Sequence, residues 1–167
     1  MKKYKRLIIA FNCLIVLMVF NYSIYKNEQL LDDSSIVFFE LAPVDPRSLM
    51  QGDYMVLDYK NSRTNSSDSI ASRGYLVFNL DENNVCTKVR LQKEKEPLND
   101  NEYILKYTKR NNWRLNFGAE SYFFEEGQAD SFERAEYGAL KIDEEGNSLL
   151  VGLYDKDLKK INPKGKN

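Results

Sequence analysis

The sequence predicts a mainly β protein: an antiparallel sandwich or partly closed barrel of about eight strands, preceded by one transmembrane helix. Three observations predict it. One long uncharged run lies near the start of the chain. Beyond that run, short segments alternate between apolar and polar residues, which is the period of a half-buried strand. Eleven tyrosines and nine phenylalanines among 167 residues also favour strands. The pattern alone does not decide between a sandwich and a barrel.

The uncharged run extends from Leu7 to Tyr25, close to the length of about 20 residues that a helix needs to cross a bilayer. Residues 1–6 contain four basic side chains, whereas mainly acidic side chains follow Lys26. The positive-inside rule therefore places the N-terminus in the cytoplasm and the rest of the chain outside it. A cleaved signal peptide is the alternative, although the residues after the apolar run are bulkier than a cleavage site requires.

These features divide the chain into five parts. We expect a basic cytoplasmic stub over 1–6, a transmembrane anchor over 7–25 and a linker over 26–34. An extracytoplasmic β domain is expected over 35–158. A frayed tail is expected over 159–167, because that segment has almost no apolar side chain to bury.

Eight strands are expected in the β domain, in the alternating runs Ile36–Ala42, Tyr54–Tyr59, Gly74–Leu80, Val85–Leu91, Tyr103–Thr108, Asn112–Phe117, Tyr137–Ile142 and Leu149–Tyr154. Turn residues at 81–84, 109–111 and 143–147 join consecutive runs as three hairpins, which implies a meander. The Ser- and Asn-rich stretch 61–72 is expected to be an exposed loop. Outside the anchor, only 127–135 has a helical pattern.

Composition excludes several classes of function. The chain contains no histidine, so a Ser/His/Asp triad, a Cys/His dyad and the common zinc sites are ruled out. Cys13 lies in the apolar run and Cys86 in a strand, so both are expected to be unpaired thiols. Residues 1–26 hold five of the 24 basic residues and none of the 25 acidic ones. The remainder therefore has 19 basic and 25 acidic residues and a net charge of −6, which argues against a nucleic-acid partner.

A corner in the chain, over residues 43–53, separates the first two expected strands. Pro43 and Pro46 cannot donate to a sheet ladder, and Gly52 lets the chain re-enter a strand. In that strand, alternation places Met55, Leu57 and Tyr59 on one face, and the other face carries Tyr54, Val56 and Asp58.

Residues 52–59 read Gly-Asp-Tyr-Met-Val-Leu-Asp-Tyr and match the pattern G-D-Y-x-x-L-x-Y in full. With this motif the chain resembles the bacterial GDYXXLXY family, and the segments 123–127, 135–138 and 150–155 are also similar to it. The resemblance implies a protein with a single N-terminal membrane anchor, found alongside or fused to multi-helix membrane proteins. It therefore implies the bacterial inner membrane, a periplasmic domain, the lipid bilayer as one partner and a multi-helix membrane protein as a candidate second partner.

The motif and its neighbours are our candidate binding residues: Arg47, Gly52, Asp53, Tyr54, Leu57, Tyr59, Glu125 and Gly127. The alternative is a structural role, in which the Asp53 carboxylate accepts hydrogen bonds that hold the turn and Tyr54 and Tyr59 only pack. We expect a non-catalytic binding module, with no catalytic residue, no metal and no cofactor. The alternative is an extracytoplasmic hydrolase. It would use Ser48 with Lys88 as base, or carboxylates from the acidic cluster Glu125, Glu126, Asp130, Glu133 and Glu136.

Overall fold

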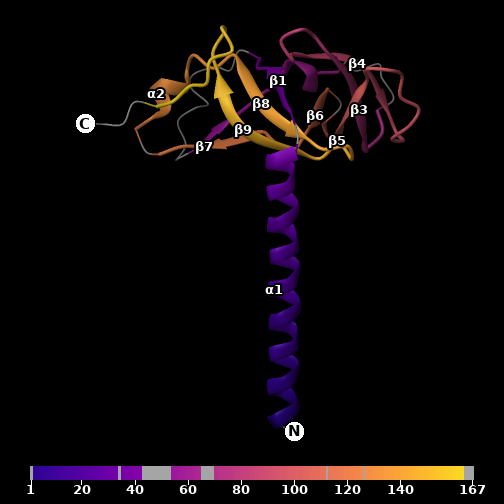
Figure 1. Cartoon of the computed structure of the whole chain (residues 1–167), viewed down its shortest axis with the longest axis vertical. Coiled ribbons are helices and arrows are strands. Elements are labelled where there is room, and N and C mark those ends of the chain that lie inside the picture. The colour runs from indigo at the N-terminus through magenta and orange to yellow at the C-terminus, as the bar shows by residue number, and fades with distance from the viewer. Residues whose placement is uncertain are drawn as a thin grey trace. The chain divides into compact units, whose positions relative to one another are not determined.

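A computed structural model describes residues 2–33, 35–42, 54–64, 70–111, 113–125 and 127–163. Contacts within the chain divide it into two compact units, Met1–Ser34 and Ser35–Asn167. The first unit contains one long helix and the second contains the strands (Figure 1).

Helix α1 extends over Lys2–Asp33. Its segment Leu7–Leu31 has a mean hydropathy of 2.2 and is long and apolar enough to cross a membrane, a property that anchors and signal sequences share. The two asparagines within it do not leave their amides unpaired. The Asn12 amide donates to the Ile8 carbonyl at 3.0 Å, and the Asn21 amide donates to the Leu17 carbonyl at 2.8 Å. These bonds satisfy polar groups inside the helix itself.

The second unit is mainly β, as predicted, with nine strands in three antiparallel sheets within its described residues. One sheet has the order β1-β8-β9, formed by Ile36–Glu40, Tyr137–Ile142 and Ser148–Tyr154. The largest has the order β4-β3-β5-β6, formed by Cys86–Gln92, Arg73–Leu80, Tyr103–Asn111 and Arg114–Asn116. The third pairs β2 with β7, Tyr54–Val56 with Ser121–Phe123.

Backbone hydrogen bonds connect the two larger sheets at their edges. The Phe38 amide donates to the Asn84 carbonyl at 2.9 Å, and the Lys106 amide donates to the Gly146 carbonyl at 2.8 Å. Gly146 has a φ of 78°, which glycine adopts without strain, and it closes the β8–β9 turn beside β5. These contacts do not close the described sheets into a barrel, and the arrangement fits a sandwich.

The core lies between the sheets and is strongly aromatic. Phe39 of β1 is fully buried, and its ring lies 5.6 Å from that of Phe78 on β3 and 6.1 Å from that of Phe117. Edge-to-face and tilted pairs of this kind add to the stabilisation that comes from burying apolar area. The core therefore joins residues that lie far apart in the chain.

Most expected strands and all three expected hairpins are confirmed. The paired strands are β3 with β4, β5 with β6, and β8 with β9. The strand expected over 54–59 ends at Val56, and 121–123 is a strand that the sequence analysis did not predict. The expected helix over 127–135 is only α2, Ala129–Phe132, and the expected loop over 61–72 begins within a 3-10 turn at Lys60–Ser62. Figure 1 shows α2 and β7 at the opposite end of the domain from β3 and β4.

The expected meander is wrong for the largest sheet, because β3 lies between β4 and β5. The chain leaves β4 at one edge and returns on the other side of β3 through the connection 93–102. The expected frayed tail also differs in its described part. Ile161 is only 2% exposed, and its amide donates to the Leu153 carbonyl at 2.9 Å. Residues 164–167 lie outside the described residues.

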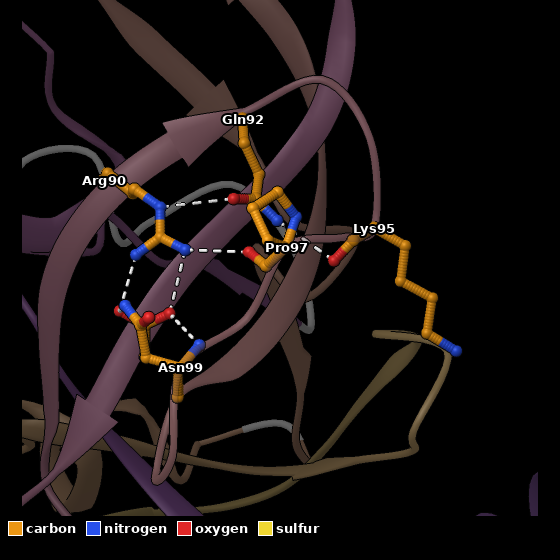
Figure 2. A network of polar contacts seen from close by, with 6 residues as sticks. Arg90, Gln92, Lys95, Pro97 and Asn99 are labelled. Atoms are coloured by element: carbon orange, nitrogen blue, oxygen red, sulfur yellow. Dashed lines mark hydrogen bonds and ion pairs between the residues drawn. The ribbon is translucent and has the colours of Figure 1, made fainter.

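A charged network holds the β4–β5 connection (Figure 2). The Arg90 guanidinium donates to both carboxylate oxygens of Glu102, at 2.5 and 2.8 Å, and to the Pro97 carbonyl at 3.0 Å. The backbone and side-chain amides of Asn99 also donate to the Glu102 carboxylate. Bidentate pairs of this kind fix geometry as well as adding charge-assisted bonds, so Arg90 locates the connection beside its own strand.

Candidate functional site

The structure describes the second part of the family motif, Tyr54–Tyr59. Three of our candidate residues, Arg47, Gly52 and Asp53, lie outside the described residues, as does the rest of the corner over 43–53. The site is therefore built from the strand that follows the corner and from β7, its partner strand.

The face of the motif segment that carries Met55, Leu57 and Tyr59 is buried. Met55, Leu57 and Tyr59 are 5%, 2% and 0% exposed. Chain segments on both sides hold this face in place, since the Leu57 amide donates to the Glu120 carbonyl at 2.8 Å and the Asp58 carbonyl accepts from the Ala42 amide at 2.6 Å. Leu57 and Tyr59 are thus placed in the core, where their side chains contribute packing.

Tyr59 is the most constrained residue of the motif. Its hydroxyl donates to the Ala119 carbonyl at 2.6 Å, and its ring packs against Phe39 and Phe117 at centroid distances of 6.1 and 5.9 Å. Gly138 of β8 lies against this ring so closely that an added Cβ would be 2.9 Å from Tyr59 Cε1. Burial, together with the nearby Glu120 carboxylate, raises the pKa of Tyr59 far above its ordinary value, so the hydroxyl stays protonated and can donate.

Asp58 connects the motif to two other segments. Its Oδ2 atom accepts from the guanidinium of Arg63 at 2.9 Å and from that of Arg114 at 2.8 Å, and its side chain is 14% exposed. Both arginines are committed to this carboxylate, so the group anchors the end of the motif to β6.

Glu120 is a structural residue that the sequence analysis missed. Its carboxylate accepts from the backbone amide of Phe117 and, at 3.0 Å, from that of Gly118. Burial raises the pKa of this carboxyl above its ordinary value despite these backbone bonds. No local pattern marks Glu120, because its role depends on the loop that leads into β7.

On the other face of the motif segment, Tyr54 and Val56 are exposed, whereas Asp58 is largely buried. Tyr54, Val56 and Phe123 are 40%, 39% and 74% exposed, and we call these three residues the aromatic patch. Tyr54 pairs with Phe123 across β2 and β7, and their rings lie 5.7 Å apart. Phe123 is the most exposed of the three, and the sequence analysis did not include it among the site residues because it did not predict β7.

Glu125 and Gly127, the remaining candidates, lie between β7 and α2. The Glu125 carboxylate accepts from the Gln128 side chain at 2.9 Å, and Gly127 has a φ of 81°, which favours glycine. Phe132 of α2 is buried against the rings of Tyr122 and Phe124, at 5.2 and 5.4 Å. This segment therefore packs on the domain through aromatic side chains.

Each of the two hydrolase arrangements includes a residue that lies outside the described residues. Within them, no group of three or more Asp, Glu or Cys side chains is placed to hold a metal ion, and Glu126 lies outside them. Ser48 also lies outside the described residues. The Lys88 amine donates to the Arg63 carbonyl at 3.1 Å.

The comparisons with known proteins give one match. A family model described as "GDYXXLXY protein" matches residues 16–153, which include the described motif, the segment between β7 and α2, and all three sheets except the last residue of β9. No curated protein and no solved structure matches the chain. Because the family model covers most of the sequence, the chain belongs to the GDYXXLXY family.

Proposed function

We propose that this protein is an uncleaved, single-pass anchored module of a bacterial cytoplasmic membrane. In this proposal its β domain lies on the extracytoplasmic side and binds an extracytoplasmic segment of an integral membrane protein without catalysis. The observation that carries the proposal is the aromatic patch, which exposes Tyr54, Val56 and Phe123 beside the family motif.

The chemistry of the patch supports a protein partner. Exposed Phe123 would contact water with 74% of its surface, which is unfavourable unless a partner covers it. Aromatic side chains are enriched in the cores of protein interfaces, where they supply large contact areas. Tyr54 adds a hydroxyl that can hydrogen-bond at the edge of such a contact.

The anchor supports a partner in the same membrane. A tethered domain meets its membrane neighbours at a raised effective concentration, so a small patch suffices for binding. The basic residues before Leu7 and the acidic ones after Lys26 support an extracytoplasmic domain.

Membrane topology is tested with a membrane-impermeant maleimide. Lys156→Cys introduces a thiol on an exposed turn, in a background that carries Cys13→Ser and keeps buried Cys86. We expect labelling in intact spheroplasts and an intact N-terminus by mass spectrometry. Labelling only after lysis would place the domain in the cytoplasm, and loss of the apolar segment would support a signal peptide instead.

Partner binding is tested by purifying the full chain from mild detergent. The double variant Tyr54→Ala/Phe123→Ala removes the aromatic rings of the patch, and Trp113→Ala is the control because Trp113 is 60% exposed elsewhere on the domain. We expect one integral membrane protein to co-purify with the wild type and the control but not with the double variant. A photo-crosslinker at position 123 should capture the same protein. Its recovery with the double variant would overturn the role of the patch.

A further inference from the structure

A hollow of about 540 Å³ opens on the largest sheet, away from the residues of the aromatic patch. Residues of β3, β5 and β6, with the segments that follow β4 and β6, form its walls. They are Arg73, Gly74, Tyr75, Lys93, Glu94, Lys106, Tyr107, Thr108, Asn116, Phe117 and Gly118. This volume falls within the range of about 300–1,000 Å³ that is typical of small-molecule sites.

The lining is basic although the domain is acidic. Arg73, Lys93 and Lys106 face a single acidic side chain, Glu94, whereas residues 27–167 together carry a net charge of −6. Within the described residues, neither Arg73 nor Lys93 forms an ion pair. These two cations are therefore available to a ligand.

The third cation is held in place. The Lys106 amine donates to the Asn147 side-chain oxygen at 2.9 Å, and the Asn147 side-chain amide donates to Asp143 at 2.7 Å. The β8–β9 turn thus positions Lys106 on the wall of the hollow. A cation fixed in this way loses little conformational entropy when a ligand binds.

The other polar groups of the lining include several donors. Tyr75 and Thr108 carry hydroxyls, and Asn116 uses its side-chain oxygen to accept from the Gly118 amide at 2.8 Å, which leaves its NH₂ group to donate. A donor-rich, cationic lining suits a ligand whose polar atoms only accept, as ionised carboxylates do. The half-buried ring of Tyr75 offers apolar surface to a carbon skeleton.

Gly74 in the lining allows the chain to pack closely at this point. A Cβ at this position would lie 2.5 Å from the Gln92 carbonyl oxygen and 2.9 Å from the Tyr107 hydroxyl. The absence of a side chain lets the Tyr107 ring cross β3 at this point.

We propose that this hollow binds an organic anion with two or more carboxylates. Arg73 offers a planar fork that matches one carboxylate, and the two lysines offer point charges to the others. Carboxylates of this kind occur on free small acids and on acidic saccharide chains. The site shares no residue with the aromatic patch, so its test is independent of the partner-binding test.

The probe is citrate, titrated by calorimetry into the full chain in mild-detergent micelles. Trigalacturonate is the second probe, because it carries its carboxylates on a saccharide chain. Triethyl citrate is the uncharged control and inorganic phosphate is the control for non-specific anion binding. We expect saturable binding of citrate, trigalacturonate or both, and none of triethyl citrate. Citrate alone indicates a free acid as the ligand, and trigalacturonate alone indicates a saccharide.

Two variants of the lining and one control variant show where the probe binds. Arg73→Gln/Lys93→Gln should weaken it at least about tenfold, because two charge-assisted contacts are lost. Lys156→Gln/Lys159→Gln makes the same change in net charge at exposed positions outside the hollow and should leave the affinity unchanged. Thr108→Trp keeps every charge and should block binding by filling the space, since Thr108 is exposed and aromatic residues suit strands.

Three results would overturn the proposal. They are the absence of saturable binding with both carboxylate probes, equal loss of affinity in the two double variants, and phosphate binding as tight as that of the carboxylates. Circular dichroism of each variant confirms that it is folded before titration.

Discussion

The two parts of the motif segment Tyr54–Tyr59 have opposite surroundings. In its second half, Leu57 and Tyr59 enter the core and are fully or almost fully buried. Its first three residues belong to a two-stranded sheet that exposes Tyr54 and Val56 on its outer face. A single run of eight motif residues therefore combines a part that holds the fold together with a part available to a partner.

A tyrosine in a motif is therefore not, on its own, evidence of a binding site. Tyr59 donates its hydroxyl to a buried carbonyl and packs among phenylalanines, so its role is structural. Tyr54 packs against an exposed phenylalanine and keeps much of its surface in solvent. Substitutions at the two tyrosines should thus separate stability from binding.

The largest effect is expected for Tyr59→Ala. Removing a buried aromatic ring and its hydrogen bond should lower the free energy of unfolding by about 3–5 kcal/mol. This loss is measured by chemical denaturation of the purified chain, monitored through the fluorescence of Trp113. A loss below about 1 kcal/mol would show that the buried part of the motif does not hold the fold, and the comparison would fail.

Gly138→Ala should have the next largest effect. The added Cβ would lie 2.9 Å from Cε1 of the Tyr59 ring, and this ring cannot move away. We expect a loss of about 1–3 kcal/mol from overpacking. Gly152→Ala on the adjacent strand is the matched control, since its Cβ would mainly meet the flexible end of Lys160. In a Tyr59→Leu background the effect of Gly138→Ala should largely disappear. If it persists, the conflict is not with the Tyr59 ring.

The β4–β5 connection differs from the buried part of the motif, because charged groups rather than apolar burial hold it in place. The Arg90 guanidinium, followed by the Asn99 amide, lowers the pKa of Glu102 to about 2. A folded-state pKa below the unfolded value of about 4.3 means that this stabilisation is fully present above that pH. It is lost as the pH falls from about 4.3 to about 2.

Glu102→Gln should therefore lower stability at neutral pH and flatten the acid limb of the stability curve. Urea unfolding at a series of pH values measures both. Glu82→Gln, at an exposed position in the β3–β4 turn, is the control and should keep the wild-type slope. An unchanged acid limb in Glu102→Gln would contradict the role of this network.

The smallest effect is expected for the aromatic patch. Tyr54 and Phe123 form one cross-strand pair, and such pairs contribute about 0.2–1 kcal/mol. A double-mutant cycle with Tyr54→Ala and Phe123→Ala should give a coupling energy in this range, by thermal or chemical unfolding. A coupling above about 2 kcal/mol would make the patch a part of the core and remove the contrast with Tyr59.

Local patterns were sufficient for the elements whose residues interact with near neighbours in sequence. The alternation of apolar residues and the turn residues at 81–84 and 143–147 predicted β3, β4, β8 and β9 and their hairpins. The same alternation divided Tyr54–Tyr59 into two faces, and the structure shows that the face of Met55, Leu57 and Tyr59 is the buried one. Strand β7 has only three residues, too few to show an alternating pattern, so its aromatic run was assigned to no strand.

The candidate site was predictable only in part. The motif residues were evident from the sequence, but the exposed partner of Tyr54 was not, because cross-strand pairing between residues 54 and 123 has no local signal. The basic hollow was missed for the same reason. Its cations come from β3, β5 and the segment after β4, and they converge only when the sheet assembles.

Composition and short-range periodicity were enough to predict the apolar N-terminal segment and the β character of the domain, and to recognise the motif. Only the tertiary structure decided that β3 lies between β4 and β5, that Tyr59 is buried beside Gly138, and that Tyr54 is exposed beside Phe123. The physical reason is that these features depend on contacts between residues far apart in the chain. The loop-closure entropy of such contacts is compensated only by the packing of the assembled core.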